Sequence, residues 1–209
     1  MKKWIDSYFN RLVVAYNDTD AKTNLIAFKE LLECIRNNNG KIILCGNGAS
    51  NTIATHGSVD FTNQLGIPSF SINDGAFLTA AANDFGYEDV FERAANLLLN
   101  PNDLIICISS SGSSPNVINA AESGRKIGAS VVTFSGFNPD NKLRKLGDIN
   151  FYVDNNEYNI VESIHNAWLV CVVDLVVQEN PKLVGVHGIE FGVKEKVYKM
   201  CEKKFVRGR

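Results

Sequence analysis

Apolar residues in the first 40 positions recur every three or four residues, which is the spacing of one face of an α-helix. They form two groups, the first including Trp4, Tyr8 and Leu12 and the second including Leu25, Phe28 and Leu32. A polar run, Asn-Asn-Asn-Gly at residues 37–40, ends the second group. We therefore expect an N-terminal helical hairpin over residues 1–40.

The apolar pattern changes beyond residue 40, where short continuous runs alternate with segments of helical spacing. Runs rich in β-branched residues predict five strands, at residues 41–45, 69–72, 104–108, 130–134 and 149–153. A last long helix is expected from Asn159 to about Gln178, before Pro181. Strands that alternate with helices favour a parallel sheet covered on both faces. The sequence thus predicts an α/β fold, a three-layer αβα sandwich around a five-stranded parallel sheet.

The length of 209 residues suits one large domain, and we find neither an internal repeat nor a low-complexity linker. We expect a single domain over residues 1–209. It consists of N-terminal helices at 1–40, an αβα core at 41–178 and a C-terminal extension at 179–209.

The composition is that of an ordinary globular protein, with 45% hydrophobic and 21% charged residues. A formal net charge of −2 provides no basic field for nucleic acid or an anionic membrane. No signal peptide and no run long enough to span a bilayer is evident. The five cysteines are scattered singly, so we expect reduced core residues. These features predict a cytoplasmic protein with no nucleic-acid and no membrane partner.

The most unusual loop follows the third predicted strand. After Ile108, six residues hold five serines around Gly112, and a helical pattern opens at Pro115. Hydroxyl donors beside the free N–H groups of a helix N-terminus favour an anion. The loop has no lysine and lacks the spacing of a nucleotide P-loop, so a phosphate monoester fits it better than a triphosphate. The alternative is a serine-rich turn with Ser114 as N-cap and Pro115 at the first helical position.

A second polar loop follows the first predicted strand. It reads Gly46, Asn47, Gly48, Ala49, Ser50 and Asn51. Ligands of parallel sheets bind at the carboxyl ends of the strands, where glycines let the backbone approach closely and Asn47 and Ser50 supply polar groups. The loop also resembles a dinucleotide-binding turn with Asp74 as ribose ligand, but Asn51 stands where that pattern has its third glycine.

Four short motifs, taken in order, resemble the sugar isomerase (SIS) domain family and, more narrowly, the bacterial phosphoheptose isomerases. They are Cys-Gly-Asn-Gly-Ala-Ser at 45–50, Asn-Asp-Phe-Gly-Tyr-Glu at 83–88, Ile-Ser-Ser-Ser-Gly-Ser-Ser at 108–114 and Glu-Ser-Ile-His at 162–165. The resemblance runs from roughly residue 24 to residue 178. It implies a flavodoxin-like fold and an aldose–ketose isomerase that converts sedoheptulose 7-phosphate or a related phosphosugar through an enediol. It also implies a homotetramer with sites at subunit interfaces, and a place in heptose, capsule or lipopolysaccharide precursor synthesis.

The resemblance carries roles to individual residues. It implies that the substrate phosphate is held by Ser50, Ser109, Ser110, Ser111 and Ser114, and that Asn47 contacts the sugar chain. The family has a histidine and a glutamate one turn apart on the helix after the first strand, which here are His56 and Asp60.

On its last helix the family has a glutamine and, eight residues later, an acid/base histidine. Here these positions are Glu162 and Val170, and a family arginine aligns with Gln64. Val170 cannot transfer a proton, whereas His165 lies three residues after Glu162 on the same helix. We expect Asp60 as base and His165 or His56 as proton shuttle, with Glu162 in the same site.

A metal hypothesis uses the same residues. His56, Asp60, Glu162 and His165 supply two imidazoles and two carboxylates, a set that suits zinc, and some phosphoheptose isomerases resemble this in binding zinc. The resemblance requires no cofactor but admits this ion. Metal-free acid/base use of some of these groups, and an ordinary core role for His165, stay open as alternatives.

A non-catalytic function is the competing hypothesis. The departures at Val170, Asp60 and Gln64 suit a phosphosugar-binding or partner-binding protein similar to the replication initiator-associating protein, which also lacks the acid/base histidine. His187 lies beyond the resemblance and is expected to be an ordinary loop residue, although it could reach a site across a subunit interface.

Overall fold

A five-stranded parallel sheet forms the centre of the computed structural model, which describes residues 1–180 and 183. The strands are β1 (Ile42–Gly46), β2 (Ser69–Ser71), β3 (Leu104–Ser109), β4 (Ser130–Gly136) and β5 (Ile149–Val153). They lie in the order β2-β1-β3-β4-β5, and every neighbouring pair is parallel. The five predicted strands and the parallel sheet are therefore confirmed. The order reverses direction between β1 and β3, which is the topological switch point.

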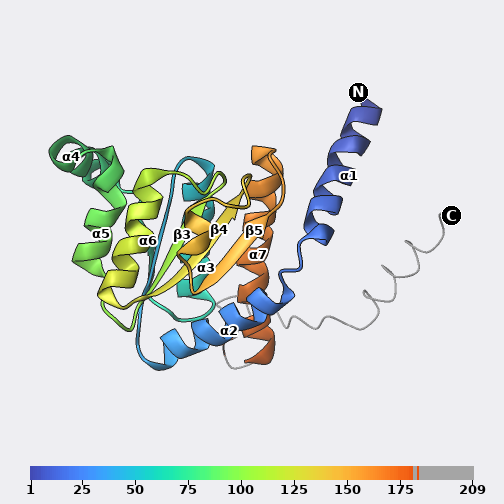
Figure 1. Ribbon diagram of the computed structural model, residues 1–209. Helices are drawn as coiled ribbons and strands as arrows, with labels where there is room; N and C mark the ends of the chain where they lie inside the picture. The colour runs from blue at the N-terminus through green and yellow to red at the C-terminus, as the bar shows by residue number, and fades with distance from the viewer. Residues whose placement is uncertain (181–182, 184–209) are drawn as a thin grey trace.

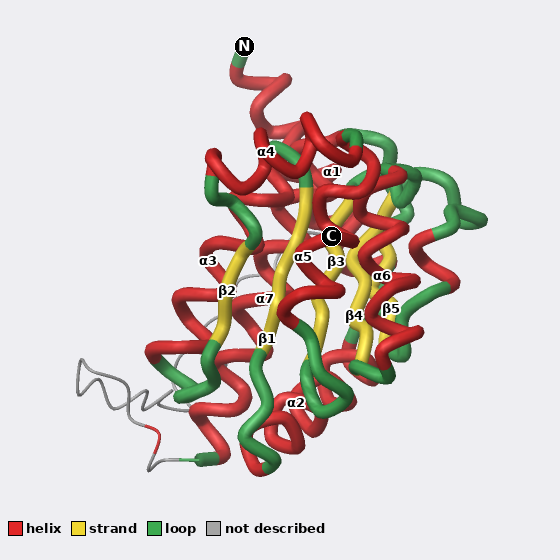
Figure 2. The backbone as a smooth tube through the Cα atoms, turned by 90° about the vertical axis from the view of Figure 1, so that its left-hand side faces the viewer, coloured by secondary structure: helices red, strands yellow, loops and turns green. Residues whose placement is uncertain are grey.

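Helices cover both faces of this sheet, as predicted. They are α1 (Lys2–Asp18), α2 (Lys22–Asn37), α3 (Ala49–Asn63), α4 (Gly75–Phe85), α5 (Val90–Leu98), α6 (Pro115–Ile127) and α7 (Tyr158–Glu179), with short 3-10 turns η1 (Tyr87–Asp89) and η2 (Leu143–Lys145). Figure 1 shows α5 and α6 on one side of the strands and α7 on the other, and Figure 2 shows the strands side by side between these layers. The three-layer sandwich is confirmed.

Two hydrophobic cores lie on the two faces of the sheet. Along β3, Leu104, Ile106 and Ile108 pack with residues of α2, α3 and α7, whereas Ile105 and Cys107 pack with residues of α4, α5 and α6. Side chains alternate between the faces of a strand, so a continuous apolar run fills both cores. This burial explains why the central strands read as uninterrupted hydrophobic segments.

The two N-terminal helices form, but they do not make the predicted hairpin. Helix α2 buries Phe28 and Leu32 in the core beside α7. Helix α1 instead extends away from the domain rather than back along α2 (Figure 1), and it leaves Trp4, Phe9 and Val13 64%, 57% and 50% exposed. The helical spacing predicted an apolar face on α1 correctly. Within one chain, however, this face packs against the domain only at the end of α1 that lies near α7.

Helix α7 confirms the predicted last helix to within one residue at each end. Among the described residues it alone is long and apolar enough to cross a membrane, which corrects the expectation that no run reaches this length, and half of its apolar window is buried inside the domain. A core helix facing a sheet has this composition, because it buries a wide apolar face. The predicted C-terminal extension, with His187 and Cys201, lies outside the described residues apart from Glu179, Asn180 and Leu183.

The cysteines only partly follow the expectation. Cys45 and Cys107 are buried partners on β1 and β3, with their Sγ atoms 3.7 Å apart. Cys34 and Cys171 are exposed, which corrects the prediction of core positions, and all four are free thiols. Cys34 on α2 and Cys171 on α7 lie within apolar sequences, but on the side of each helix that faces solvent.

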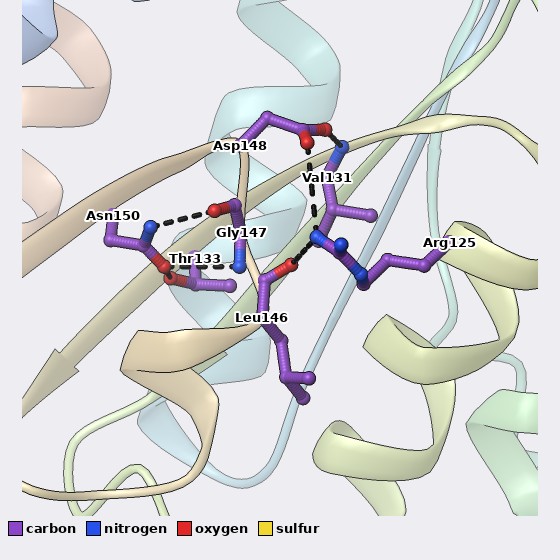
Figure 3. Close-up of polar contacts among 7 residues, drawn as sticks. All are labelled: Arg125, Val131, Thr133, Leu146, Gly147, Asp148 and Asn150. Atoms are coloured by element: carbon purple, nitrogen blue, oxygen red, sulfur yellow. Dashed lines mark hydrogen bonds and ion pairs between the residues drawn. The ribbon is translucent and has the colours of Figure 1, made fainter.

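Side-chain bonds close the amino-terminal edge of the sheet. Figure 3 shows Asp148 accepting from Val131 N at 2.8 Å and Asn150 accepting from Thr133 Oγ1 at 2.7 Å. At the start of β3, the buried Asp103 carboxylate accepts from Lys41 N at 2.9 Å and Asn100 N at 2.7 Å. The Lys41 ammonium also pairs with Asp103. Polar groups at this edge therefore find their partners inside the chain.

Candidate active site

The two polar loops leave the sheet side by side at the switch point. Gly46 at the end of β1 is in register with Ile108 of β3, so the loops that follow are neighbours. A Cβ atom on Gly46 would lie 2.8 Å from Ser50 Cβ and 3.0 Å from Ile108 O. Glycine at this position lets the first turn of α3 pack against β3.

The serine loop after β3 is held in a tight turn. Gly112 has a φ of +62°, and its N–H donates to Ser109 O at 2.9 Å. A Cβ atom on Gly112 would meet Asn141 Oδ1 at 2.1 Å. Asn141 is itself buried, donating to Asn138 O at 2.9 Å and accepting from Arg144 N at 2.8 Å. The loop between β4 and β5 thus supports the serine loop through one fixed amide.

The serine hydroxyls surround the N-terminus of α6. Ser114 and Pro115 occupy the cap and first helical positions, as the turn alternative predicted, but the Ser114 side chain makes no capping hydrogen bond. Its Oγ lies 3.2 Å from Ser109 Oγ instead. Ser111 Oγ accepts only a long 3.3 Å bond from Ser113 N. Hydroxyls that do not cap the helix are available to an anion at its positive end, which favours the phosphate-site interpretation.

Asn47 joins a polar cluster on one side of the serine loop. Asn47 and Asn116 form a reciprocal amide pair in which each Nδ2 donates to the other Oδ1 at 2.9 Å. The Tyr87 hydroxyl also donates to Asn47 Oδ1 at 2.9 Å. These three residues line a cavity of about 360 Å³ with Ser114 and Pro115.

Neither Asn116 nor Tyr87 was among the predicted site residues. Asn116 follows Ser114 by two positions in the first turn of α6, and Tyr87 lies inside one of the four motifs, so both signals were present in the sequence. Their contacts with Asn47 span 69 and 40 residues of chain, which local patterns do not reveal.

A second cavity, of about 550 Å³, lies between α3 and α7. We call it the α3–α7 furrow; it is lined by Ala49, Thr52, Ile53, His56, Asn159, Glu162, Ser163 and Asn166. Ser110 Oγ donates to Glu162 Oε1 at 3.3 Å. This bond connects the serine loop to the furrow, so a ligand with its phosphate at the serines can extend towards the two helices.

His56 and Asp60 share one face of α3, as their spacing predicted. His56 Nε2 lies 3.3 Å from Asp60 Oδ2, and its Nδ1 lies 3.2 Å from Asn166 Oδ1 on α7. The His56 side chain is 50% exposed and that of Asp60 19%. Burial raises the pKa of the nearby Asp174 carboxyl, and the charge of Asp60 raises it further. A half-exposed imidazole beside a carboxylate can exchange protons with a ligand in the furrow.

His165 does not belong to this site, which corrects its predicted role as proton shuttle. The ring is fully buried, its Nε2 donates to Ser135 O at 3.0 Å, and it lies edge-on to Phe134. Burial lowers the pKa of His165 to about 4, outweighing the bond to Ser135. Three residues place His165 about 60° around the helix from Glu162, and the docking of α7 directs that side towards the core.

The predicted four-residue zinc set is not assembled in one chain. Over residues 1–180 and 183, no three His, Cys, Asp or Glu side chains gather closely enough to hold a metal ion. His56 and Asp60 meet on α3 and Glu162 lies across the furrow, but His165 points into the core. The core alternative for His165 is the one that its burial supports.

Three further positions are settled by their contacts or location. Asp74 caps α4, where its Oδ1 accepts from Phe77 N at 2.7 Å, so a structural role accounts for this carboxylate without a ribose ligand. Gln64 is the C-cap residue of α3. Val170 is a half-buried residue of α7 that brings no titratable group to the furrow.

Comparison with known proteins gives a consistent result. The family model described as "SIS domain" matches residues 6–136. Phosphoheptose isomerase of Aliarcobacter butzleri is 37% identical over 145 residues, which cover 66% of this chain and 76% of that protein.

Solved structures share the fold. The phosphoheptose isomerase from Francisella tularensis superimposes with a TM-score of 0.77 at 26% identity, covering 84% of this chain and 97% of that one. The phosphoheptose isomerase from Neisseria gonorrhoeae gives a TM-score of 0.78 at 24% identity, covering 85% of this chain and 98% of that one.

Proposed function

Because the chain belongs to the SIS domain family and, within it, to the phosphoheptose isomerases, we propose that it interconverts sedoheptulose 7-phosphate and an aldoheptose 7-phosphate. The observation that carries this proposal is the serine loop at the N-terminus of α6, one hydrogen bond away from the furrow that is lined by His56, whose imidazole contacts Asp60. An anion site next to an acid/base pair suits isomerisation of a phosphorylated sugar.

The phosphate would be held by hydroxyls and by the helix dipole. Ser109, Ser111 and Ser114 lie just before the first turn of α6 and would donate to the phosphate, and Ser110 links the loop to Glu162. Ser50, which is 4% exposed in the first turn of α3, is the further hydroxyl donor that we assign to the phosphate. A phosphate dianion is bound most tightly where several groups at one helix end donate short hydrogen bonds to it.

The reaction moves one proton between two neighbouring carbons. In our proposal the Asp60 carboxylate removes the proton from C1 of the ketose, which forms an enediol, and the proton returns at C2 to give the aldose. His56 moves the second proton between the two oxygens, because its ring is accessible and adjacent to Asp60. Glu162, across the furrow, would contact the hydroxyls of the reacting end.

We further propose that the protein acts in the cytoplasm as a homotetramer with its sites at subunit interfaces. The exposed apolar side chains of α1, among them Trp4 and Phe9, are a surface that a second copy of the chain would cover. Its product would supply heptose, capsule or lipopolysaccharide precursors, and we expect neither nucleic acid nor membrane as a partner.

The test follows hydrogen exchange at the reacting carbon. The full chain is incubated with sedoheptulose 7-phosphate in D₂O, with and without added zinc, and the C1 protons are followed by NMR. We expect loss of a C1 proton signal and appearance of an aldose, and no such change with Asp60→Asn. Absence of exchange under both metal conditions would overturn the isomerase proposal.

A non-catalytic phosphosugar-binding function is the second candidate. It is favoured by Val170 and by the burial of His165, which leave α7 without an accessible imidazole in its described residues. This function predicts that the sugar phosphate binds without C1 exchange and that Val170→His creates activity where the natural chain has none. A rapid exchange by the natural chain would exclude it.

A further inference from the structure

A polar stripe on α7 faces α3 across the furrow. Glu162 and Asn166 are four residues apart and both line this cavity, so they lie on one helix face. Val170 continues this spacing. Asp174 is four residues further along, and the charge of Asp60 on α3 contributes to raising the pKa of its carboxyl. On this stripe Asn166 contacts His56 and Asp174 lies near Asp60, and the apolar Val170 separates the two polar residues.

Asn166 is the residue of this stripe that contacts the imidazole. Its Oδ1 lies 3.2 Å from His56 Nδ1, while the other ring nitrogen faces Asp60 Oδ2 at 3.3 Å. The ring is thus bracketed by one group from each helix. Asp60 belongs to the same helix as His56, so Asn166 is what fixes the ring relative to α7.

We propose that Asn166 is a positioning residue that holds the His56 imidazole in the furrow and fixes which ring nitrogen carries the proton. This inference rests on the proposed isomerase function, to which it adds a residue on α7. A neutral imidazole has one N–H and one bare nitrogen, so the partner at Nδ1 selects the tautomer. The Asn166 amide presents its oxygen to Nδ1, so it accepts from Nδ1–H and favours the tautomer that is protonated at this nitrogen.

An amide partner suits a shuttle better than a carboxylate would. A shuttle takes a proton at one oxygen of the enediol and returns it at the other, so it must remain in place in both protonation states. Asn166 carries no charge, and its oxygen can accept from Nδ1–H in both the neutral ring and the imidazolium, which leaves Nε2, beside Asp60, to take up and release the proton. The pair gives α7 a part in proton transfer although Val170 has no titratable group.

The contact can be removed without opening a core. Asn166 is half-buried and lines the furrow, and the His56 side chain is 50% exposed. Asn166→Ala should therefore fold, and Asn63→Ala, at an exposed position at the end of α3, is a matched control outside the site.

The first test measures the tautomer directly and does not require activity. Long-range ¹H–¹⁵N spectra of the full ¹⁵N-labelled chain report the two ring nitrogens of each of its three histidines, and His56→Gln assigns one set. We expect two well-separated ¹⁵N shifts for His56 in the natural chain and in Asn63→Ala. In Asn166→Ala the separation should fall by roughly half or more, as the tautomers mix. An unchanged His56 pattern in Asn166→Ala would overturn the inference.

The second test separates positioning from binding. With sedoheptulose 7-phosphate, Asn166→Ala should lower kcat on the order of tenfold to a hundredfold and leave KM within about twofold. Asn166→Gln, which keeps the amide on a longer arm, should recover part of kcat. Equal kcat in Asn166→Ala and Asn63→Ala would overturn the inference while leaving the isomerase proposal intact. An inactive natural chain would end the isomerase proposal, and the ring spectra would still decide whether Asn166 positions His56.

Discussion

The two edges of the sheet treat polar side chains in opposite ways. At the amino-terminal edge, Asp103 accepts from two backbone N–H groups and pairs with Lys41, and Asp148 accepts from Val131 N. At the carboxyl-terminal edge, Ser114 heads a helix without capping it, and Ser111 has only a long bond. Both edges are rich in polar residues, but only the second leaves donors for a ligand.

The difference teaches where stability and function reside in this fold. Strand ends that bury charges must satisfy them internally, because an unpaired buried carboxylate is costly. Loops at the opposite edge can leave hydroxyl groups without hydrogen-bond partners in the protein, because water can reach these hydroxyls. Substitutions of polar residues at the amino edge should therefore change chiefly folding, and substitutions of the exposed loops at the carboxyl edge should change chiefly ligand binding.

The largest effect is expected from Gly112→Ala. The added methyl would clash with Asn141 Oδ1 at 2.1 Å in a left-handed turn, so the serine loop must move. We expect kcat/KM for the phosphosugar to fall on the order of a hundredfold or more. Gly128→Ala is the matched control, since Gly128 has a φ of +89° at the other end of α6 and a Cβ there meets nothing closer than 3.7 Å. Similar activity losses in both variants would contradict a special role for the loop.

Next in size is the effect of Asp103→Ala on folding. The substitution leaves the N–H groups of Lys41 and Asn100 without their acceptor at a buried position. We expect the free energy of unfolding in urea to fall by about 2–4 kcal/mol, with kcat/KM of the folded enzyme unchanged. The exposed Asp140→Ala should change neither quantity. A change in kcat/KM with Asp103→Ala would contradict the separation of stability and ligand binding between the two edges of the sheet.

His165 lies beside the carboxyl edge but should behave as a structural residue. Its pKa is about 4 in the folded chain against an ordinary value of 6.5, so the unfolded chain binds a proton first as the pH falls. Stability from the neutral ring is complete above pH 6.5 and is lost towards pH 4. We expect this to cost about 2 kcal/mol between pH 7 and pH 5. His165→Gln, which keeps a donor for Ser135 O, should reduce that loss in urea titrations at both pH values. An equal pH dependence in the two proteins would contradict the assignment.

The smallest effect is expected from removing one hydroxyl of the serine loop. Ser111→Ala should raise KM for the phosphosugar about tenfold with kcat unchanged, because one of several donors to the phosphate is lost. Ser130→Ala, at the start of β4 on the opposite edge, is its control. If neither variant alters KM, Ser111 is not a phosphate ligand.

Features that depend on local pattern could be predicted from the sequence. The five strands followed from apolar runs such as residues 104–108, and the serine loop followed from its position after one of them. Helix α7 followed from its length and from the residues that end it. These properties are decided within a few neighbouring residues, which is why one sequence suffices for them.

Features that depend on packing between distant elements could not be predicted. His165 and Asn166 are neighbours on α7, and only the docking of that helix decides that the first faces the core and the second the furrow. The open position of α1 and the Asn47–Asn116 pair have the same origin. In each case the sequence contains the residues concerned, but the packing of distant elements decides what they contact.

The amide pair between Asn47 and Asn116 has a consequence for sugar recognition. Asn47 Oδ1 already accepts from Asn116 and Tyr87, so a sugar hydroxyl can donate to that oxygen only by exchanging places with one of them. A deoxy analogue that displaces the same partners would leave polar atoms unpaired, which costs far more than a missing contact in an open site. If Asn47 contacts the sugar as proposed, we therefore expect the protein to discriminate against sugars that lack this hydroxyl.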